Sequence, residues 1–203
     1  MTSWARRELW LIRHAESAWN AMRLWQGHAD PGLSARGVAQ AEALAERLAG
    51  MRIEAIVASD LRRARETARI VAAGLRLEPS HDARLRERDL GSWSGLTTPQ
   101  IAGRWPEQLA RLRARDVDFR PGGGESIRQV TVRAAAFFRE LALRPGPARW
   151  AIVTHGGLIR ALRPDRATPI ANAEAVRVTL GELLAACEPE AITTIGAAAA
   201  ERL

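Results

Sequence analysis

Short apolar runs alternate with amphipathic helical patterns along most of this 203-residue chain. Three segments have the length and composition of buried strands: residues 8–12 (ELWLI), 53–59 (IEAIVAS) and 149–154 (RWAIVT). A fourth strand is predicted over residues 173–180 (AEAVRVTL). Strands that alternate with helices form a sheet that is mostly parallel and is covered by helices on both faces. The order therefore predicts an α/β fold, a three-layer sandwich with a mostly parallel central sheet flanked by helices.

The segments between these strands have helical spacing. Residues 34–50 begin with Ser34, an expected N-cap, and place five apolar residues on one face: Val38, Ala41, Leu44, Ala45 and Leu48. A second helix is expected over 60–74, with Asp60 as its N-cap and Gly74 at its end. Helical patterns also follow the sequence PGGGE and begin in HGGLIRAL. Each of the first three predicted strands is thus followed by a predicted helix.

The length and the 47% hydrophobic composition suit one domain, residues 1–203, with a sizeable core. One polar, Trp-containing stretch interrupts the alternation and ends in PGGGE. We call its central part, about 88–124, the excursion, and expect it to cross the active face as a lid. The last residues, about 196–203 (GAAAAERL), are expected to form a disordered tail.

The formal net charge of +7 would ordinarily indicate an anionic macromolecule as partner. All thirty basic residues are arginine, and they are spread along the chain instead of forming one stripe. This distribution indicates a compositional bias, and we expect no nucleic-acid partner.

The single cysteine, Cys187, excludes an internal disulfide and favours a reducing compartment. Arg13 and His14 interrupt the first apolar run too early for a signal peptide. No segment reaches the roughly 20 apolar residues of a membrane span. We therefore expect a cytoplasmic protein with no membrane partner.

Side chains capable of anion chemistry follow the predicted strands. In parallel sheets, functional groups gather at the carboxyl ends of strands, where loops meet helix N-termini. Arg offers a rigid fork of donors, and His acts as nucleophile or acid. Five residues are expected to meet at this edge, three after strands, one in a first helical turn and one before the excursion: Arg13, His14, His155, Arg63 and Glu87.

Each of these residues also has an ordinary structural explanation. An arginine in a first helical turn is usually solvated, and a lone histidine at a strand end is more often structural than catalytic. The recurrence of histidine at two strand ends favours a site. A metal site built on His14 and His155 lacks carboxylates or cysteines at ligand spacing, so we expect no metal and no cofactor.

Six sequence blocks occur in the order and spacing of one known family: LIRHAESAWN, QGHADPGLSARG, SDLRRARETA, LRERDLGSWSG, PGGGES and VTHGGLIRAL. Over residues 8–180 the chain resembles the histidine phosphatase superfamily, which has the phosphoglycerate mutase-like fold. The resemblance implies that His14 is the phosphorylated nucleophile and Glu87 the proton donor to the leaving group. It implies that Arg13, Arg63 and His155 hold the phosphoryl oxygens. The remaining pocket residues expected to bind phosphate or substrate are Ser17, Asn20, Gln26, Gly27 and Gly156.

The resemblance implies a phosphomonoesterase that acts on small phosphorylated metabolites through a phosphohistidine. Residues 96–119 form a short stretch without lysine or a paired-arginine block, which favours a phosphatase over a mutase. Four arginines there and the next one along the chain are candidates for recognising an acidic substrate: Arg104, Arg111, Arg113, Arg115 and Arg120.

Several alternatives stay open from the sequence. These are phosphoglycerate mutase-type phosphoryl transfer, a non-catalytic phospholigand-binding protein, and a homodimeric state. The physiological substrate is also open. The segment after Leu162 is shorter than is usual in the family, which predicts a missing helix and an altered flank of the sheet.

Overall fold

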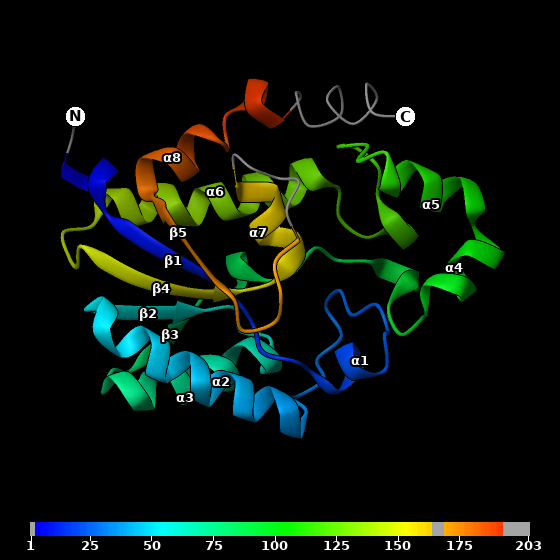
Figure 1. Cartoon of the computed structure of the whole chain (residues 1–203). Coiled ribbons are helices and arrows are strands. Elements are labelled where there is room, and N and C mark those ends of the chain that lie inside the picture. The colour runs from blue at the N-terminus through cyan, green and yellow to red at the C-terminus, as the bar shows by residue number, and fades with distance from the viewer. Residues whose placement is uncertain (1–2, 164–168, 193–203) are drawn as a thin grey trace.

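The computed structural model describes residues 3–163 and 169–192, and the predicted tail at about 196–203 lies outside them. Within these residues one sheet has the strand order β3-β2-β4-β1-β5 (Figure 1). Its strands are β1 (Glu8–Arg13), β2 (Ala55–Ala58), β3 (Pro79–His81), β4 (Arg149–Thr154) and β5 (Ala175–Thr179). All neighbouring pairs are parallel except β1 and β5, which run antiparallel at one edge. The predicted mostly parallel sheet is confirmed.

Helices cover both faces of the sheet (Figure 1). The described α-helices are α1 (Ala18–Ala21), α2 (Ala35–Leu48), α3 (Arg62–Leu75), α4 (Thr98–Arg104), α5 (Pro106–Arg113), α6 (Ile127–Leu143), α7 (Gly156–Leu162) and α8 (Leu180–Ala185). Helices α2 and α3 lie on one face, and α6, α7 and α8 lie on the other. The expected three layers are therefore present.

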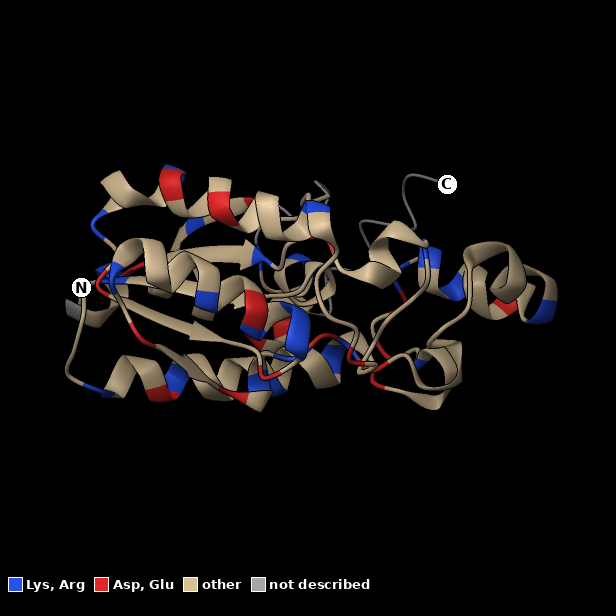
Figure 2. Cartoon of the chain, turned by 90° about the horizontal axis from the view of Figure 1, so that it is seen from below, with Lys and Arg blue, Asp and Glu red and all other residues tan. Residues whose placement is uncertain are grey.

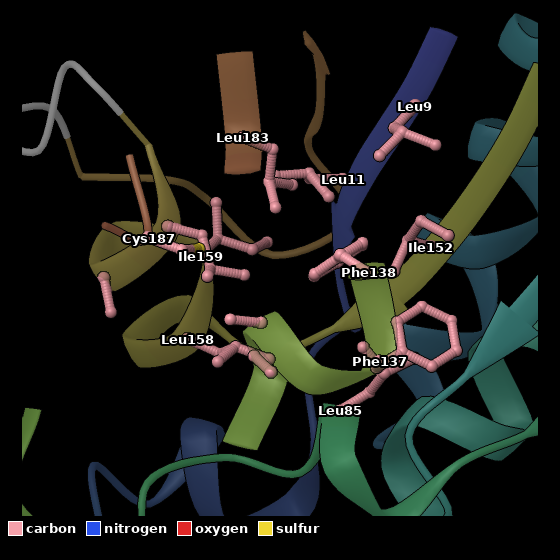
Figure 3. Close-up of a cluster of buried hydrophobic side chains, with 14 of the residues drawn as sticks. Leu9, Leu11, Leu85, Phe137, Phe138, Ile152, Leu158, Ile159, Leu183 and Cys187 are labelled. Atoms are coloured by element: carbon pink, nitrogen blue, oxygen red, sulfur yellow. The ribbon is translucent and has the colours of Figure 1, made fainter. Parts of the chain in front are cut away.

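Alternate residues of the central strands enter two separate cores. In β1, Leu9 and Leu11 pack with α6 and α8, whereas Trp10 and Ile12 pack with α2 and α3. Figure 3 shows the first of these cores, where Phe138 of α6 lies near the strand residues. This two-residue period is the geometry of a strand, and it explains why nearly the whole ELWLI run is apolar.

Some local predictions were wrong. Ser34 does cap α2, because its hydroxyl accepts a hydrogen bond from the Gly37 backbone. Asp60 does not cap α3, which begins after Leu61, and its carboxylate instead pairs with Arg86 at 2.6 and 2.7 Å. Val38 is 40% exposed and lies outside the buried face. An ion pair between distant segments thus replaces the expected cap.

The excursion packs around a small apolar cluster of its own. Trp93 is fully buried at its centre, stacks on Trp105 and makes an edge contact with Trp25. Helices α4 and α5 of the excursion lie well away from α2 and α3 in Figure 1. Trp93 and Trp105 therefore both pack in this cluster.

Residues 164–168, in the segment where a missing helix was predicted, lie outside the described residues. Residues 169–174 contain no helix. Among the described helices, none has both the length and the apolar character needed to cross a membrane. Figure 2 shows acidic and basic residues interspersed over the elements, as the sequence indicated.

Candidate active site

The sheet register brings two histidines together. Arg13 and Thr154 are paired residues at the ends of the parallel strands β1 and β4, so His14 and His155 follow side by side. Their ring centroids lie 5.1 Å apart, and the two side chains are 3% and 0% exposed. Two strands that both end in histidine thus produce one buried pair.

His14 is held as a neutral ring with a defined tautomer. Its Nδ1 lies 2.7 Å from the carbonyl oxygen of Ala15, which only accepts, so Nδ1 carries the proton. The other nitrogen, Nε2, accepts from the Nε–H of Arg63 at 3.3 Å. Burial, reinforced by the Arg63 charge, lowers the pKa of His14 well below its usual range. The ring therefore keeps a lone pair on Nε2 at neutral pH.

Arg63 comes from the first turn of α3 and is 1% exposed. Its terminal nitrogens donate to the carbonyl oxygens of Ala29 at 2.7 Å and Gly27 at 2.9 Å. Burial lowers its pKa to about 10, so the guanidinium remains a cation at neutral pH. Backbone acceptors thus fix the orientation of this charge beside His14.

Arg13 and His155 supply buried nitrogen atoms that have no hydrogen-bond partner among residues 3–163 and 169–192. Arg13 donates from Nη1 to the Ile170 carbonyl at 2.8 Å, but its Nε is unpaired. Both ring nitrogens of His155 are also buried and unpaired. Burial, followed by the Arg63 charge, lowers the pKa of His155 well below its usual range. Unpaired buried polar atoms are rare in proteins and suit a polar ligand.

Glu87 approaches the same place from the loop that leads into the excursion. Its Oε2 accepts from the Gly157 backbone N–H at 3.0 Å, and its Oε1 accepts from that of Arg88 at 2.9 Å. A Cβ atom on Gly157 would lie 2.3 Å from Oε1, so only glycine allows this contact. The second glycine of the VTHGG sequence is thereby explained.

The predicted binding residues of the QGH and RHAESAWN blocks have two different placements. Asn20, Gln26 and Gly27 line the cavity that His14 faces. Ser17 is fully buried behind them, where it caps α1 and donates to the Oε1 of Gln26 at 2.9 Å. Gly27 has a φ of +50°, and a Cβ there would lie 2.8 Å from the Leu90 backbone nitrogen.

Sequence reasoning missed Asn172, which lies just before β5 and is far from α1 in the chain. Its Nδ2 donates to the His14 carbonyl at 2.9 Å and to the Asn20 Oδ1 at 3.3 Å. It therefore joins the backbone of one predicted site residue to the side chain of another. A lone asparagine in a polar segment carries no signal of this role in the sequence.

One cavity of about 450 Å³ contains most of these groups. Eight of the ten predicted site residues line it. The other two, Ser17 and His155, are fully buried, and the His155 ring lies next to that of His14. Its lining includes one carboxylate, that of Glu87, and six arginines: Arg13, Arg23, Arg63, Arg88, Arg115 and Arg160. Apolar side chains, including Trp25, Leu112 and Ile170, cover the remaining wall. The cavity is strongly complementary to an anion with an organic substituent.

Two parts of the cavity differ in exposure. We call His14, Arg13, Arg63 and Glu87 the floor, because these side chains are buried or half-buried. We call Arg23 and Arg160 the rim, because both are exposed while lining the same cavity.

The excursion contributes one of its five candidate arginines to the cavity, Arg115. Arg111 instead pairs with Asp116 at 2.7 Å and lies over the ring of Phe119. Arg120 donates to carbonyl oxygens of its own glycine-rich turn. Of the five candidates, Arg115 is therefore the one that lines the cavity.

No group of three or more metal-ligating side chains occurs within residues 3–163 and 169–192. Positive charge in this cavity comes from arginine side chains. Fixed cationic donors around a lone-pair nitrogen are suited to stabilising a transferring phosphoryl group.

Comparisons with known proteins agree with this chemistry. A family model described as the histidine phosphatase superfamily (branch 1) matches residues 9–183. Phosphoglycerate mutase-like protein 4 of Arabidopsis thaliana is 40% identical over 169 residues, which are 81% of this chain and 73% of that protein. Phosphoserine phosphatase 1 of Hydrogenobacter thermophilus is 36% identical over 157 residues, covering 76% and 74%. A mycobacterial glucosyl-3-phosphoglycerate phosphatase solved with VO3 is 34% identical, with a TM-score of 0.77 over 87% of this chain and 95% of that one.

Proposed function

This chain belongs to the histidine phosphatase superfamily and is a phosphatase of that type, and we propose that it hydrolyses small phosphate monoesters through a phosphohistidine on His14. The observation that carries the proposal is the state of the His14 ring. Its Nδ1 proton is committed to the Ala15 carbonyl, and its Nε2 lone pair lies beside the fixed Arg63 cation. A neutral, oriented imidazole next to a cation is the arrangement that attack on a phosphoryl group requires.

In the first step, the Nε2 lone pair of His14 attacks phosphorus, and the bond from phosphorus to the ester oxygen breaks. Arg13, Arg63 and His155 donate to the phosphoryl oxygens, with the unpaired Arg13 Nε and a His155 ring N–H among the donors. The carboxyl group of Glu87 transfers its proton to the departing oxygen, which leaves as an alcohol.

In the second step, water attacks the phosphohistidine. The Glu87 carboxylate takes a proton from that water, the bond from phosphorus to Nε2 breaks, and inorganic phosphate forms. The lone pair returns to Nε2, and Glu87 is again protonated. Every group thus returns to its starting state, and the arginines provide the charge stabilisation that a metal ion provides in other phosphoryl-transfer sites.

The remaining cavity residues are proposed to bind substrate. Asn20, Gln26, Gly27 and Gly156 line the cavity next to the floor. Ser17 has a different proposed role, because its hydroxyl holds Gln26 and Asn20 from behind. It positions substrate-binding residues and does not touch substrate.

Hydrolysis is favoured over mutase chemistry by the lining of the cavity. A mutase must hold a second anionic group of its substrate during transfer. The excursion lines the cavity with Arg88 and Arg115, and the guanidinium of Arg88 already donates to the carbonyl oxygens of Glu125 and Phe119. The rim arginines nevertheless favour phosphate monoesters whose alcohol part carries a carboxylate or a second phosphate. The single buried Cys187 suits a reducing, cytoplasmic setting for this small-molecule reaction.

The decisive experiment combines a substrate panel with trapping of the intermediate. Purified protein is expected to release phosphate from an aryl phosphate and from members of a panel of small alkyl monoesters, in the presence of EDTA. Acid-free quenching followed by peptide mass spectrometry should find phosphate on His14. Vanadate, which imitates the transition state, should inhibit. Absence of phosphate release across the panel would support a non-catalytic phospholigand-binding protein, and phosphate transfer to an added alcohol acceptor without hydrolysis would support a mutase.

A further inference from the structure

We propose that Arg133 and Glu125 are positioning residues that hold the Glu87 loop, residues 84–89, so that the Glu87 carboxylate is aimed at the leaving group. This inference rests on the proposed function, because it assigns Glu87 the role of acid and base. Neither residue lines the cavity or contacts the floor side chains. Their effect on the reaction would therefore pass through the backbone of this loop.

The guanidinium of Arg133, in α6, binds three carbonyl groups of the loop. Its Nη1 donates to the carbonyl oxygens of Arg84 at 2.8 Å and Arg86 at 3.0 Å. Its Nη2 donates to that of Glu87 at 3.1 Å. One rigid side chain thus fixes the backbone at Glu87, the proposed acid, and at two residues before it.

Glu125 completes the arrangement from the other side of Glu87. Its carboxylate accepts from Arg133 at 2.9 Å and 2.7 Å and from the Asp89 backbone N–H at 3.0 Å. Burial opposes its ionisation, but the hydrogen bonds from Arg133 and Asp89 outweigh burial and lower the pKa of Glu125. An ionised Glu125 therefore orients Arg133 and anchors the residues that follow Glu87.

His28 makes a further contact with the same loop. Its Nε2 lies 2.8 Å from the Glu87 carbonyl oxygen, so this nitrogen carries the donated proton. The same atom lies 3.8 Å from a carboxylate oxygen of Glu125. The carbonyl of the proposed acid is thus bound by two side chains from segments far apart in the sequence.

The backbone of the loop is oriented by side chains, because residues 86–90 form neither helix nor strand. The carbonyl of Leu85, between the Arg133 contacts, accepts from the Thr154 hydroxyl at 2.7 Å. All four carbonyls from Arg84 to Glu87 therefore have a side-chain donor. Because a misplacement of about 1 Å can cost about 100-fold in rate, loss of these donors should weaken proton transfer.

The test compares leaving groups in the phosphorylation step. Arg133→Lys keeps the charge but cannot reach three carbonyls with a fixed geometry. In single-turnover kinetics, we expect it to slow phosphorylation by an alkyl phosphate by about 10- to 100-fold and by an aryl phosphate by less than about 3-fold. An aryl oxide leaves without a proton, so it is insensitive to the position of Glu87. Vanadate affinity should stay unchanged, because Arg13, His14 and Arg63 keep their positions.

Two further variants distinguish positioning from general damage. Glu125→Gln should also slow phosphorylation by alkyl esters more than by aryl esters, with a smaller loss of rate than Arg133→Lys. This variant keeps the proposal testable if Arg133→Lys does not fold. Arg84→Lys is the matched control. Arg84 lies in the same loop as Glu87, but its side chain pairs with Asp82 and with Glu140 of α6 and forms no hydrogen bond with Glu87, so this variant should show no leaving-group selectivity.

The double variant Arg133→Lys/Glu87→Gln completes the test. If Arg133 acts through Glu87, adding Arg133→Lys to Glu87→Gln should cause no further loss on the alkyl ester. Equal losses on alkyl and aryl esters, or a full additional loss in the double variant, would overturn the positioning role. Absence of leaving-group selectivity in Glu87→Gln alone would instead refute the acid assignment, so the two failures are distinguishable.

Discussion

The floor and the rim of the cavity use the same side chain in opposite ways. On the floor, backbone carbonyls bind the guanidinium groups of Arg13 and Arg63. On the rim, the side chains of Arg23 and Arg160 are exposed and form no hydrogen bond or ion pair with the part of the chain that the structure describes. The difference is between a charge with a fixed direction and a charge that can move to meet its partner.

The difference follows from where the arginines originate. Arg13 ends β1 and Arg63 begins α3, so regular elements and their packing decide both positions. Arg23 follows the short helix α1, and Arg160 lies on the outer side of α7. Fixed donors stabilise a charge that always develops at the same point, whereas mobile donors tolerate different organic groups. The floor would thus determine the reaction and the rim the choice among substrates.

Removing the nucleophile should have the largest effect of all changes. His14→Ala is expected to reduce phosphate release by about 10⁴-fold or more with every monoester, because no covalent acceptor remains whatever the leaving group. The measurement is steady-state phosphate release from one aryl and one alkyl ester. Vanadate binding should persist if the arginines stay in place. Substantial activity in this variant would mean that another residue is phosphorylated.

The substitution Glu87→Gln should have the second-largest effect on the rate, and the size of this effect should depend on the leaving group. Phosphorylation by an alkyl ester is expected to fall by about 10²- to 10⁴-fold, because its alkoxide needs a proton. The rate of phosphorylation by an aryl ester should fall much less, and single-turnover kinetics measure this step for both esters. Phosphohistidine should also accumulate, because water is no longer activated.

Equal losses on both ester types would remove Glu87 as the general acid. The nearest carboxylate in the sequence, Asp89, would then be the first alternative. Its carboxylate caps the turn at Gly91 and does not line the cavity, which makes this exchange of roles structurally unfavourable.

Acid should lower the stability of the whole protein through its two buried histidines. His14 and His155 are neutral in the folded protein, because burial lowers both pKa values well below 6.5, but they regain ordinary values on unfolding. The unfolded chain therefore binds more protons below about pH 6.5. The free energy of unfolding should fall with decreasing pH, by up to about 1.4 kcal/mol per pH unit for each histidine, and should be fully retained above about pH 7.5.

Urea unfolding between pH 5.5 and 8 tests this expectation. His14→Ala should have a shallower pH dependence than the unsubstituted protein, because one of the two histidines is gone. Arg23→Gln, which changes only the rim, should leave the slope unaltered. Identical slopes in all three proteins would contradict the neutral state of the buried histidines.

The rim substitutions should have the smallest effect and should depend on the substrate. Arg23→Gln and Arg160→Gln are each expected to lower kcat/KM about 3- to 5-fold for monoesters with a carboxylate or second phosphate, mainly through KM, since exposed charge pairs are weak. Uncharged alcohol parts should be unaffected, and added salt should reduce the difference. Arg113→Gln, an exposed arginine of α5 that does not line the cavity, is the matched control. Equal effects on charged and uncharged esters would show that the rim does not select substrates.

Much of the fold followed from local sequence patterns, and the family resemblance added to them gave eight of the residues that line the cavity. Apolar runs that end in Arg-His or Thr-His predicted β1 and β4, and parallel pairing then requires that His14 and His155 meet. The strand β3 was missed because its three residues, Pro79–His81, are largely polar and exposed. The antiparallel direction of β5 was also not predicted, because apolar patterning indicates burial but not strand direction.

The contacts of polar side chains depended on the tertiary structure alone. Asp60 was expected to cap a helix but pairs with Arg86, and Ser17 was expected to face substrate but supports Gln26 from behind. Likewise, nothing in the sequence connects Arg133 with the Glu87 carbonyl. The period of apolar residues is a local property that the sequence determines by itself. Which distant carbonyl or carboxylate a guanidinium reaches is decided only when packing brings the segments together, because hydrogen bonds depend on distances of about 3 Å and on direction.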